Sequence, residues 1–173
     1  TAVSTEYPFI HEVAKAFRRL VPGACLVIGG PHTSLNPADV IPGPFDAICI
    51  GEGERPMAEL LGMLSRGEKP AGIPNLWIKH EDGIDRNETR PFVENLDELP
   101  FPAWDLVDVE LYRQTWKRRH RYFSVNMGTT RGCPYHCNWC AKPIYGQVYN
   151  SRSPENVVAE MKFLKEKIHP DHL

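Results

Sequence analysis

Two short apolar runs, each ending at glycine, constrain the fold of this chain more than any other feature. Residues 24–28 lead into Gly29 and Gly30, and residues 45–50 lead into Gly51. Neither run alternates apolar with polar residues, which is typical of strands buried on both faces of a parallel sheet. Such a sheet requires helices on both sides.

Helical patterns lie beside both runs. Apolar residues recur every three or four positions over residues 9–20, and Pro22 and Gly23 end that pattern. A second helix is expected over residues 56–65, with a stop at Gly67. We therefore predict a doubly wound, Rossmann-like α/β domain over residues 1–73. Its ligand would bind beyond the carboxyl ends of the strands, where glycine lets a ligand approach the backbone, although glycine is also common in simple turns there.

The rest of the chain has a different pattern. Residues 75–79 and the residues from Ile84 onward flank an Asp-Gly turn and predict a hairpin. It opens a proline-containing connecting segment over residues 74–121. Residues 122–127 predict a strand, and Ser153 with Pro154 predicts the start of a helix that runs to about Ile168. We expect residues 122–173 to begin a partial β/α barrel.

Three cysteines, Cys133, Cys137 and Cys140, are spaced C-x-x-x-C-x-x-C. They are candidate ligands of one 4Fe-4S cluster, and three thiolates leave one iron open to a small molecule. The alternative is a structural zinc site completed by His136, but zinc sites usually use paired C-x-x-C units and no second pair exists here. Cys25 and Cys49 lie in the apolar runs and are expected to be buried small hydrophobes.

The cysteine motif, with Trp139 directly before the third cysteine, resembles the signature of the radical S-adenosylmethionine superfamily. The resemblance implies that the open iron is chelated by the amino and carboxylate groups of S-adenosylmethionine and that Trp139 lies against the adenine. Reductive cleavage would then give a 5'-deoxyadenosyl radical. A low-potential donor, flavodoxin or ferredoxin, would supply the electron.

The N-terminal part resembles the second half of a cobalamin-binding domain fused to a radical S-adenosylmethionine domain. The resemblance rests on the strand end Ser4-Thr5, on residues 27–32 and on residues 46–54. It implies a pocket for the cobalamin nucleotide tail. His32 follows the Gly-Gly turn and does not match the lower cobalt ligand of that family, whose Asp-x-His-x-x-Gly element is not in this chain. The residues implied at the pocket are Ser4, Thr5, Gly29, Gly30, Gly51 and Glu52.

Composition excludes several other classes. The chain has 173 residues, 42% of them hydrophobic, and a net charge of −2, so no global charge attracts nucleic acid or an anionic membrane. The apolar runs are too short to span a membrane, and an odd number of cysteines argues against a secreted disulfide framework. A cytoplasmic location follows. The basic patch at residues 116–122 is too short to favour nucleic acid over a solvated surface.

The two ends of the sequence indicate that it is a fragment of a longer protein, because the first residue is Thr1 and residues 169–173 stop where another strand should start. The resemblance implies a radical S-adenosylmethionine enzyme acting on a small molecule, namely a cobalamin-dependent C- or P-methyltransferase. Cyclisation or rearrangement of a tetrapyrrole or lipid is the alternative within this class. A non-catalytic corrinoid-binding or metal-binding module is the alternative outside it. No general acid or base can be named within these residues.

Overall fold

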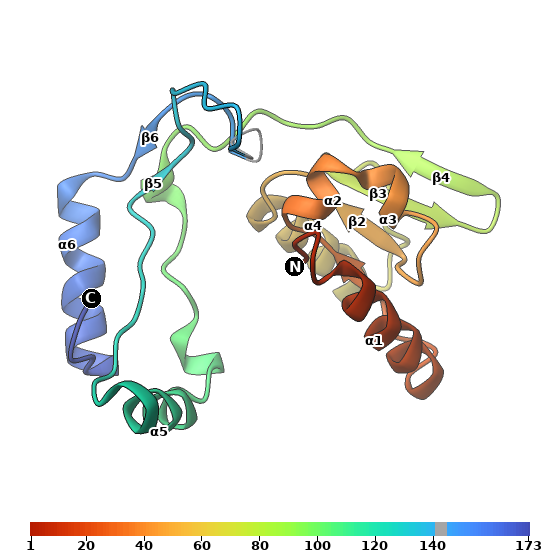
Figure 1. Ribbon diagram of the computed structural model, residues 1–173. Coiled ribbons are helices and arrows are strands. Elements are labelled where there is room, and N and C mark those ends of the chain that lie inside the picture. The colour runs from red at the N-terminus through yellow and green to blue at the C-terminus, as the bar shows by residue number, and fades with distance from the viewer. Residues whose placement is uncertain (141–144) are drawn as a thin grey trace. The chain divides into compact units, whose positions relative to one another are not determined.

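The computed structural model describes residues 1–140 and 145–173 and is shown in Figure 1. The chain divides into two compact units. The N-terminal unit contains residues 1–93 and the described part of 136–147, whereas the C-terminal unit contains residues 94–135 and 148–173. No helix in the described part of the chain is long and apolar enough to cross a membrane.

The N-terminal unit is built on one four-stranded sheet with strand order β1-β2-β3-β4. The first two strands are parallel, and the others pair antiparallel. The predicted hairpin therefore exists, but it extends the sheet instead of belonging to a separate connector. The sheet is mixed where the sequence predicted a parallel one, because apolar periodicity does not encode strand direction. The strands are β1 (Val27–Ile28), β2 (Ala47–Cys49), β3 (Leu76–His80) and β4 (Gly83–Arg86).

Helices cover both faces of this sheet, as predicted. Ile48 packs on one side in a cluster with Ala14 of α1 (Tyr7–Leu20). Ala47 and Cys49 point to the other side and pack with Leu60 of α4 (Glu54–Ser65). Two short helices, α2 (Pro31–Leu35) and α3 (Pro37–Val40), fill the connection between β1 and β2. The result is a three-layer α/β/α unit.

Strand β1 begins at Val27 instead of Ala24 because side chains engage the backbone just before it. Arg18 Nη1 donates a hydrogen bond to the Ala24 carbonyl at 2.6 Å. The Leu26 N–H donates to Asp46 Oδ2 at 2.6 Å. These backbone groups are therefore not available for a strand ladder.

The two cysteines outside the motif differ in burial. Cys25 lies before β1 and is exposed, so the expectation that it is buried was wrong. Cys49 is buried, as predicted, and burial raises the pKa of its thiol to about 11.

The C-terminal unit has a small core formed by Phe123, Val125, Leu164 and Ile168. The helix predicted from Ser153 is present as α6 (Pro154–Phe163) and continues as a π-helical turn, η4 (Leu164–Ile168). The other elements of this unit in the described part of the chain are the 3₁₀ turns η1 (Leu96–Glu98) and η2 (Trp104–Leu106), the helix α5 (Val109–His120), and the strands β5 (Thr130–Arg131) and β6 (Asn150–Ser151).

The strand predicted over residues 122–127 is reduced to a single parallel bridge between Ser124 and His172. Its apolar alternation reflects the burial of Phe123 and Val125 in the core. Backbone hydrogen bonds join these two residues to Asp171 and His172, which is too short a pairing to count as a strand. The bridge places residues 169–173 beside this segment, where the sequence predicted that another strand should start.

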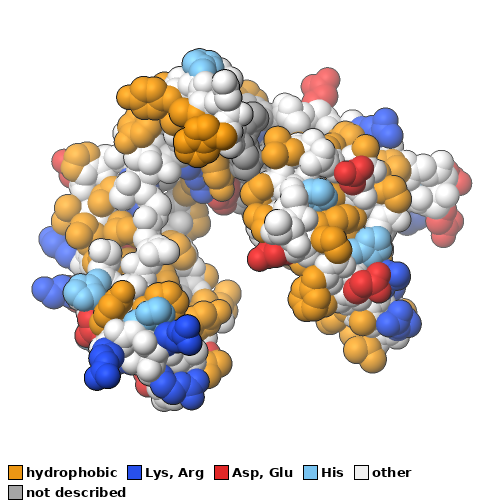
Figure 2. All heavy atoms as spheres, in the orientation of Figure 1, with side chains coloured by type: hydrophobic (Ala, Val, Ile, Leu, Met, Phe, Trp, Pro, Cys, Tyr) orange, Lys and Arg blue, Asp and Glu red, His pale blue; other side chains and the backbone are white. Residues whose placement is uncertain are grey.

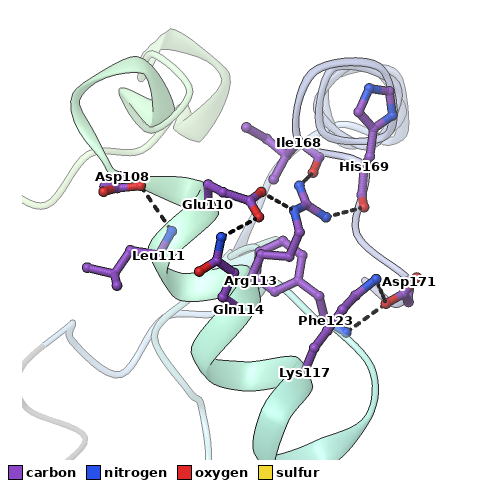
Figure 3. Close-up of polar contacts among 10 residues, drawn as sticks. All are labelled: Asp108, Glu110, Leu111, Arg113, Gln114, Lys117, Phe123, Ile168, His169 and Asp171. Atoms are coloured by element: carbon purple, nitrogen blue, oxygen red, sulfur yellow. Dashed lines mark hydrogen bonds and ion pairs between the residues drawn. The ribbon is translucent and has the colours of Figure 1, made fainter.

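Helix α5 was missed by the sequence analysis, which assigned its residues to the connecting segment. Asp108 caps it by accepting a hydrogen bond from the Leu111 N–H at 3.0 Å. Arg113 donates to the carbonyls of Ile168 and His169, which ties α5 to the end of the chain (Figure 3). The predicted basic patch forms the exposed end of this helix, where Figure 2 shows Lys and Arg side chains gathered.

Candidate functional site

The cysteine motif lies in a loop whose two stems are joined in the C-terminal unit. Strands β5 and β6 pair antiparallel, with Arg131 opposite Asn150. One residue beyond the ends of these strands, the Arg152 N–H donates to the Thr129 carbonyl at 2.9 Å. The Arg152 side chain reaches the Gly128 carbonyl at 3.0 Å. The loop is therefore closed at its base by backbone and side-chain bonds together.

Arg152 also fixes this base to α6. It donates to Asn156 Oδ1 at 2.6 Å and pairs with Glu160. The two charged side chains are only 10% and 2% exposed. Burial removes water from this ion pair, so no water can take the place of Arg152 beside the Glu160 carboxylate.

The three cysteines of the motif are all free thiols. Cys133 is half-buried, while Cys137 and Cys140 are exposed and joined by a backbone hydrogen bond of 3.3 Å from the Cys140 N–H. Among the residues that the structure describes, no group of three His, Cys, Asp or Glu side chains is gathered for a metal ion. The donor chemistry nevertheless fits an iron-sulfur cluster, since all three thiols are available as ligands. Trp139, between the last two cysteines, is 87% exposed.

A pocket of about 350 Å³ lies at the carboxyl ends of β1 and β2 in the N-terminal unit. It includes four of the six residues predicted to surround cobalamin. This volume suits part of a large cofactor, such as a heterocycle with its sugar, because small-ligand pockets span roughly 300–1,000 Å³. The residues that line it are Thr1, Val27, Gly29, Gly30, Pro31, Cys49, Gly51, Glu52, Gly53, Glu54, Met57 and Tyr145.

Gly30 shapes one wall of the pocket through its backbone. Its φ is +108°, and a Cβ there would lie 2.7 Å from Cγ2 of Thr1 and 2.8 Å from the nitrogen of Ala2. Any larger residue would displace the chain that crosses it. Gly30 is therefore needed for the close approach of Thr1 and Ala2, and it also leaves the pocket wall free of a side chain.

Ser4 and Thr5 do not line the pocket, although the resemblance implied both. Ser4 Oγ lies 3.1 Å from Nδ1 of His32, which is buried and stacks on Tyr7 with ring centroids 4.6 Å apart. His32 thus has a packing role in this unit. Thr5 is exposed.

The pocket is acidic. Glu52 lines it but is only 8% exposed, and its Oε2 accepts a hydrogen bond from the Val93 N–H at 2.7 Å. Glu54 is the second carboxylate, and no Lys or Arg occurs among the described lining residues. A neutral ligand fragment is therefore favoured over a phosphate.

Of the twelve described residues that line the pocket, eight were not predicted from the sequence, and Met57 and Tyr145 are two of them. Met57 points in from α4, and Tyr145 arrives from the segment that follows the cysteine motif. Met57 could have been found as a first-turn residue of the helix after Gly51. No local signal marks Tyr145, because it reaches the pocket through tertiary packing alone.

No protein-family model matches the chain. Among curated proteins, the chain is 34% identical over 168 residues to an uncharacterised methyltransferase, PH0819, of Pyrococcus horikoshii, covering 95% of this chain and 35% of the relative. It is 23% identical over 163 residues to the anaerobic magnesium-protoporphyrin IX monomethyl ester cyclase of Synechocystis, covering 93% and 32%. It is 28% identical over 132 residues to the cobalamin-dependent radical methyltransferase TokK of Streptomyces tokunonensis, covering 75% and 19%.

Solved structures agree. The radical S-adenosylmethionine methyltransferase TsrM of Kitasatospora setae, solved with cobalamin and a 4Fe-4S cluster, matches with a TM-score of 0.62 and 25% identity over 91% of this chain and 31% of TsrM. The cobalamin-dependent radical enzyme OxsB has the same fold, with a TM-score of 0.72 and 18% identity over 95% of this chain and 23% of OxsB.

The homologues of this chain are therefore radical S-adenosylmethionine enzymes. More narrowly, they are cobalamin-dependent radical S-adenosylmethionine methyltransferases and enzymes related to them, which confirms the resemblance found in the sequence. The chain spans about a third of the length of the first curated relatives that it matches.

Proposed function

We propose that this chain carries the cofactor-binding part of a cobalamin-dependent radical S-adenosylmethionine methyltransferase that acts on a small molecule. One observation carries the proposal: a free three-cysteine motif and a glycine-walled pocket at the carboxyl edge of an α/β sheet occur in one chain. Methyltransferase relatives and the cobalamin-bound TsrM support it.

The chain's own residues would divide the work. Cys133, Cys137 and Cys140 would hold a 4Fe-4S cluster, and Trp139 would offer a flat surface to the adenine of S-adenosylmethionine. When bound, these cofactors supply radical chemistry and, with cobalamin, methyl transfer. Gly29, Gly30 and Gly51 would leave backbone walls for the cobalamin tail, next to the acidic side chain of Glu52. Ser4 and Thr5 are not assigned a contact with the cobalamin tail, because neither lines the pocket.

The remaining assignments follow from this chemistry. An open iron and three free thiols require a reducing compartment, which for this protein would be the cytoplasm. A low-potential flavodoxin or ferredoxin would supply the electron. We keep the predicted arrangement of a cobalamin-binding part at residues 1–73, a connecting segment at 74–121 and a barrel start at 122–173, although the hairpin of that connecting segment completes the N-terminal sheet.

A second reaction class is favoured by a specific relative. The anaerobic magnesium-protoporphyrin IX monomethyl ester cyclase covers 93% of this chain. Ring formation on a tetrapyrrole would use the same cluster and pocket with a different substrate. A non-catalytic corrinoid-binding or metal-binding module is the alternative of a different class, and it requires an inert cysteine loop.

The proposal is tested by anaerobic reconstitution of the protein with iron and sulfide. We expect about four irons and four sulfides per chain, an EPR signal after reduction, and a change of that signal on adding S-adenosylmethionine. Alanine at Cys133, Cys137 or Cys140 should abolish cluster binding. Cys25→Ala is the matched control, because that thiol is exposed but lies outside the motif.

Two results would count against the enzyme. Zinc in place of iron would support the non-catalytic metal-binding module. A cluster whose EPR signal does not change on adding S-adenosylmethionine would contradict the proposed radical chemistry but would still support the cysteines as cluster ligands.

A further inference from the structure

The pocket of the N-terminal unit is lined on one side by a residue that follows the cysteine motif. Tyr145 lies five residues after Cys140 in the sequence and is the only aromatic residue among the described residues that line the pocket. We propose that Tyr145 contacts the heterocyclic base of a corrinoid in this pocket and couples pocket occupancy to the cysteine loop. This inference rests on the cobalamin assignment made above.

The position of Tyr145 is fixed by its neighbour. Gly146 has a φ of +77°, and a Cβ there would lie 2.9 Å from Cε2 of Phe92. Only glycine lets the backbone pack this closely against the ring. Phe92 is followed by Val93, whose N–H is held by the carboxylate of Glu52. Tyr145 is therefore held against the same unit that forms the pocket, through a chain of close contacts.

The chemistry of the pocket favours a ring contact. Four of its lining residues are glycines, which present backbone and no side chain. Tyr145 is 47% exposed, so its ring has surface left to bury against a ligand. With two carboxylates and no Lys or Arg among the described lining residues, a neutral flat heterocycle suits this position better than a phosphate.

Coupling follows from where two of the cysteines belong. Cys137, Cys140 and Tyr145 all lie in the described part of 136–147, which belongs to the N-terminal unit. A ligand that contacts Tyr145 favours this placement of the segment. Because coupling between two binding events is reciprocal, a loaded cluster should then tighten corrinoid binding by the same factor by which the corrinoid tightens cluster binding.

The test is a titration of the purified protein with hydroxocobalamin, followed by visible absorption, before and after cluster reconstitution. We expect Tyr145→Ala to raise the Kd by about tenfold, the effect of losing one good aromatic contact. Tyr145→Phe keeps the ring and should stay within about twofold. Cluster loading should lower the Kd of the wild type, and this gain should vanish in Tyr145→Ala.

Tyr149→Ala is the matched control, because Tyr149 is 59% exposed, lies in the C-terminal unit and does not line the pocket. Gly146→Ala is a second variant that retains the tyrosine but displaces it, and it should also weaken binding. Circular dichroism and iron content of each variant identify misfolding.

Several outcomes would overturn the inference. If Tyr145→Ala bound hydroxocobalamin with wild-type affinity, the proposed contact would be wrong. An equal loss of affinity in Tyr149→Ala would contradict it as well. A Kd in the wild type that does not respond to the cluster would remove the coupling. A wild type that holds its cluster but binds no cobalamin would instead reject the cobalamin assignment, and the contact with it, so the two failures are distinguishable.

Discussion

Each unit contains an arginine that makes several hydrogen bonds between chain segments, and the two arginines differ in how deeply they are buried. Arg18 of the N-terminal unit donates to the carbonyls of Pro22, Ala24 and Pro44 and pairs with Asp46 at 2.5 Å. Arg152 of the C-terminal unit makes an equivalent set of bonds at the base of the cysteine loop.

The difference lies in exposure to water. The Arg18 and Asp46 side chains are 29% and 45% exposed, whereas those of Arg152 and Glu160 are 10% and 2% exposed. Water can replace the lost bonds of Arg18 but cannot reach Glu160. The Arg18–Asp46 ion pair should therefore contribute modestly to stability, whereas loss of the Arg152–Glu160 ion pair at the base of the cysteine loop should cost much more.

The largest expected effect comes from Arg152→Met. It leaves Glu160 buried without its partner, so we expect a loss of about 3–5 kcal/mol in the free energy of unfolding. Arg18→Met should cost about 1–2 kcal/mol, because its partners remain hydrated. Urea unfolding, combined with hydrogen exchange resolved along the chain, assigns each loss to its unit.

This comparison also predicts a functional difference. Arg152→Met should lower the iron content after reconstitution, since the base of the loop opens, and Arg18→Met should not. Equal losses of stability in the two variants would show that burial does not separate these arginines.

An intermediate effect is expected at the pocket. Gly30→Ala places a Cβ within 3 Å of Thr1 and Ala2 at a positive φ, and should cost about 1–3 kcal/mol. Gly23→Ala is the control, because a Cβ there meets nothing within 4 Å. Thermal unfolding of the two variants measures the difference. A harmless Gly30→Ala would mean that the chain near Thr1 moves aside freely.

The smallest effect concerns pH in the C-terminal unit. The Asp171 carboxylate accepts a hydrogen bond from the backbone N–H of Phe123 and forms an ion pair with Lys117 at 3.1 Å (Figure 3). These two interactions hold the pKa of the Asp171 carboxyl below its ordinary 3.8. The folded form thus favours the ionised carboxylate. The resulting stabilisation is complete above the ordinary pKa and is lost as the pH falls through the lower, folded value.

Tryptophan fluorescence and circular dichroism between about pH 5 and pH 2 measure this transition. Asp171→Asn can still accept from Phe123 but carries no charge, so it should remove this part of the pH dependence. An unchanged acid transition in Asp171→Asn would assign the titration to other carboxylates.

Much of the N-terminal unit was predictable from its sequence because its signals are local. Apolar periodicity located α1, α4 and the two parallel strands, and glycine marked the carboxyl edge where the pocket lies. The direction of β3 was not predictable, since it depends on which strand edge the hairpin meets. Nor was the late start of β1, because Arg18 and Asp46 come from distant positions to bind its backbone.

The C-terminal unit was harder to predict for a related reason. The segment around Phe123 has the alternation of a strand but only one bridge, because the length of a strand depends on how far its partner runs beside it. Helix α5 has an N-cap and a basic last turn that could have identified it, yet its weak apolar face gave no periodic signal.

The sequence by itself determined the chemistry of this protein: three thiols at a fixed spacing, the aromatic residue between them, and the glycines that end two buried strands. These properties reside in side-chain identity and in neighbouring residues. Only the tertiary structure decided that Tyr145 lines the pocket, that Ser4 and Thr5 do not, and that Arg152 and Glu160 meet out of reach of water. Such placements depend on how distant segments pack, and no local pattern records them.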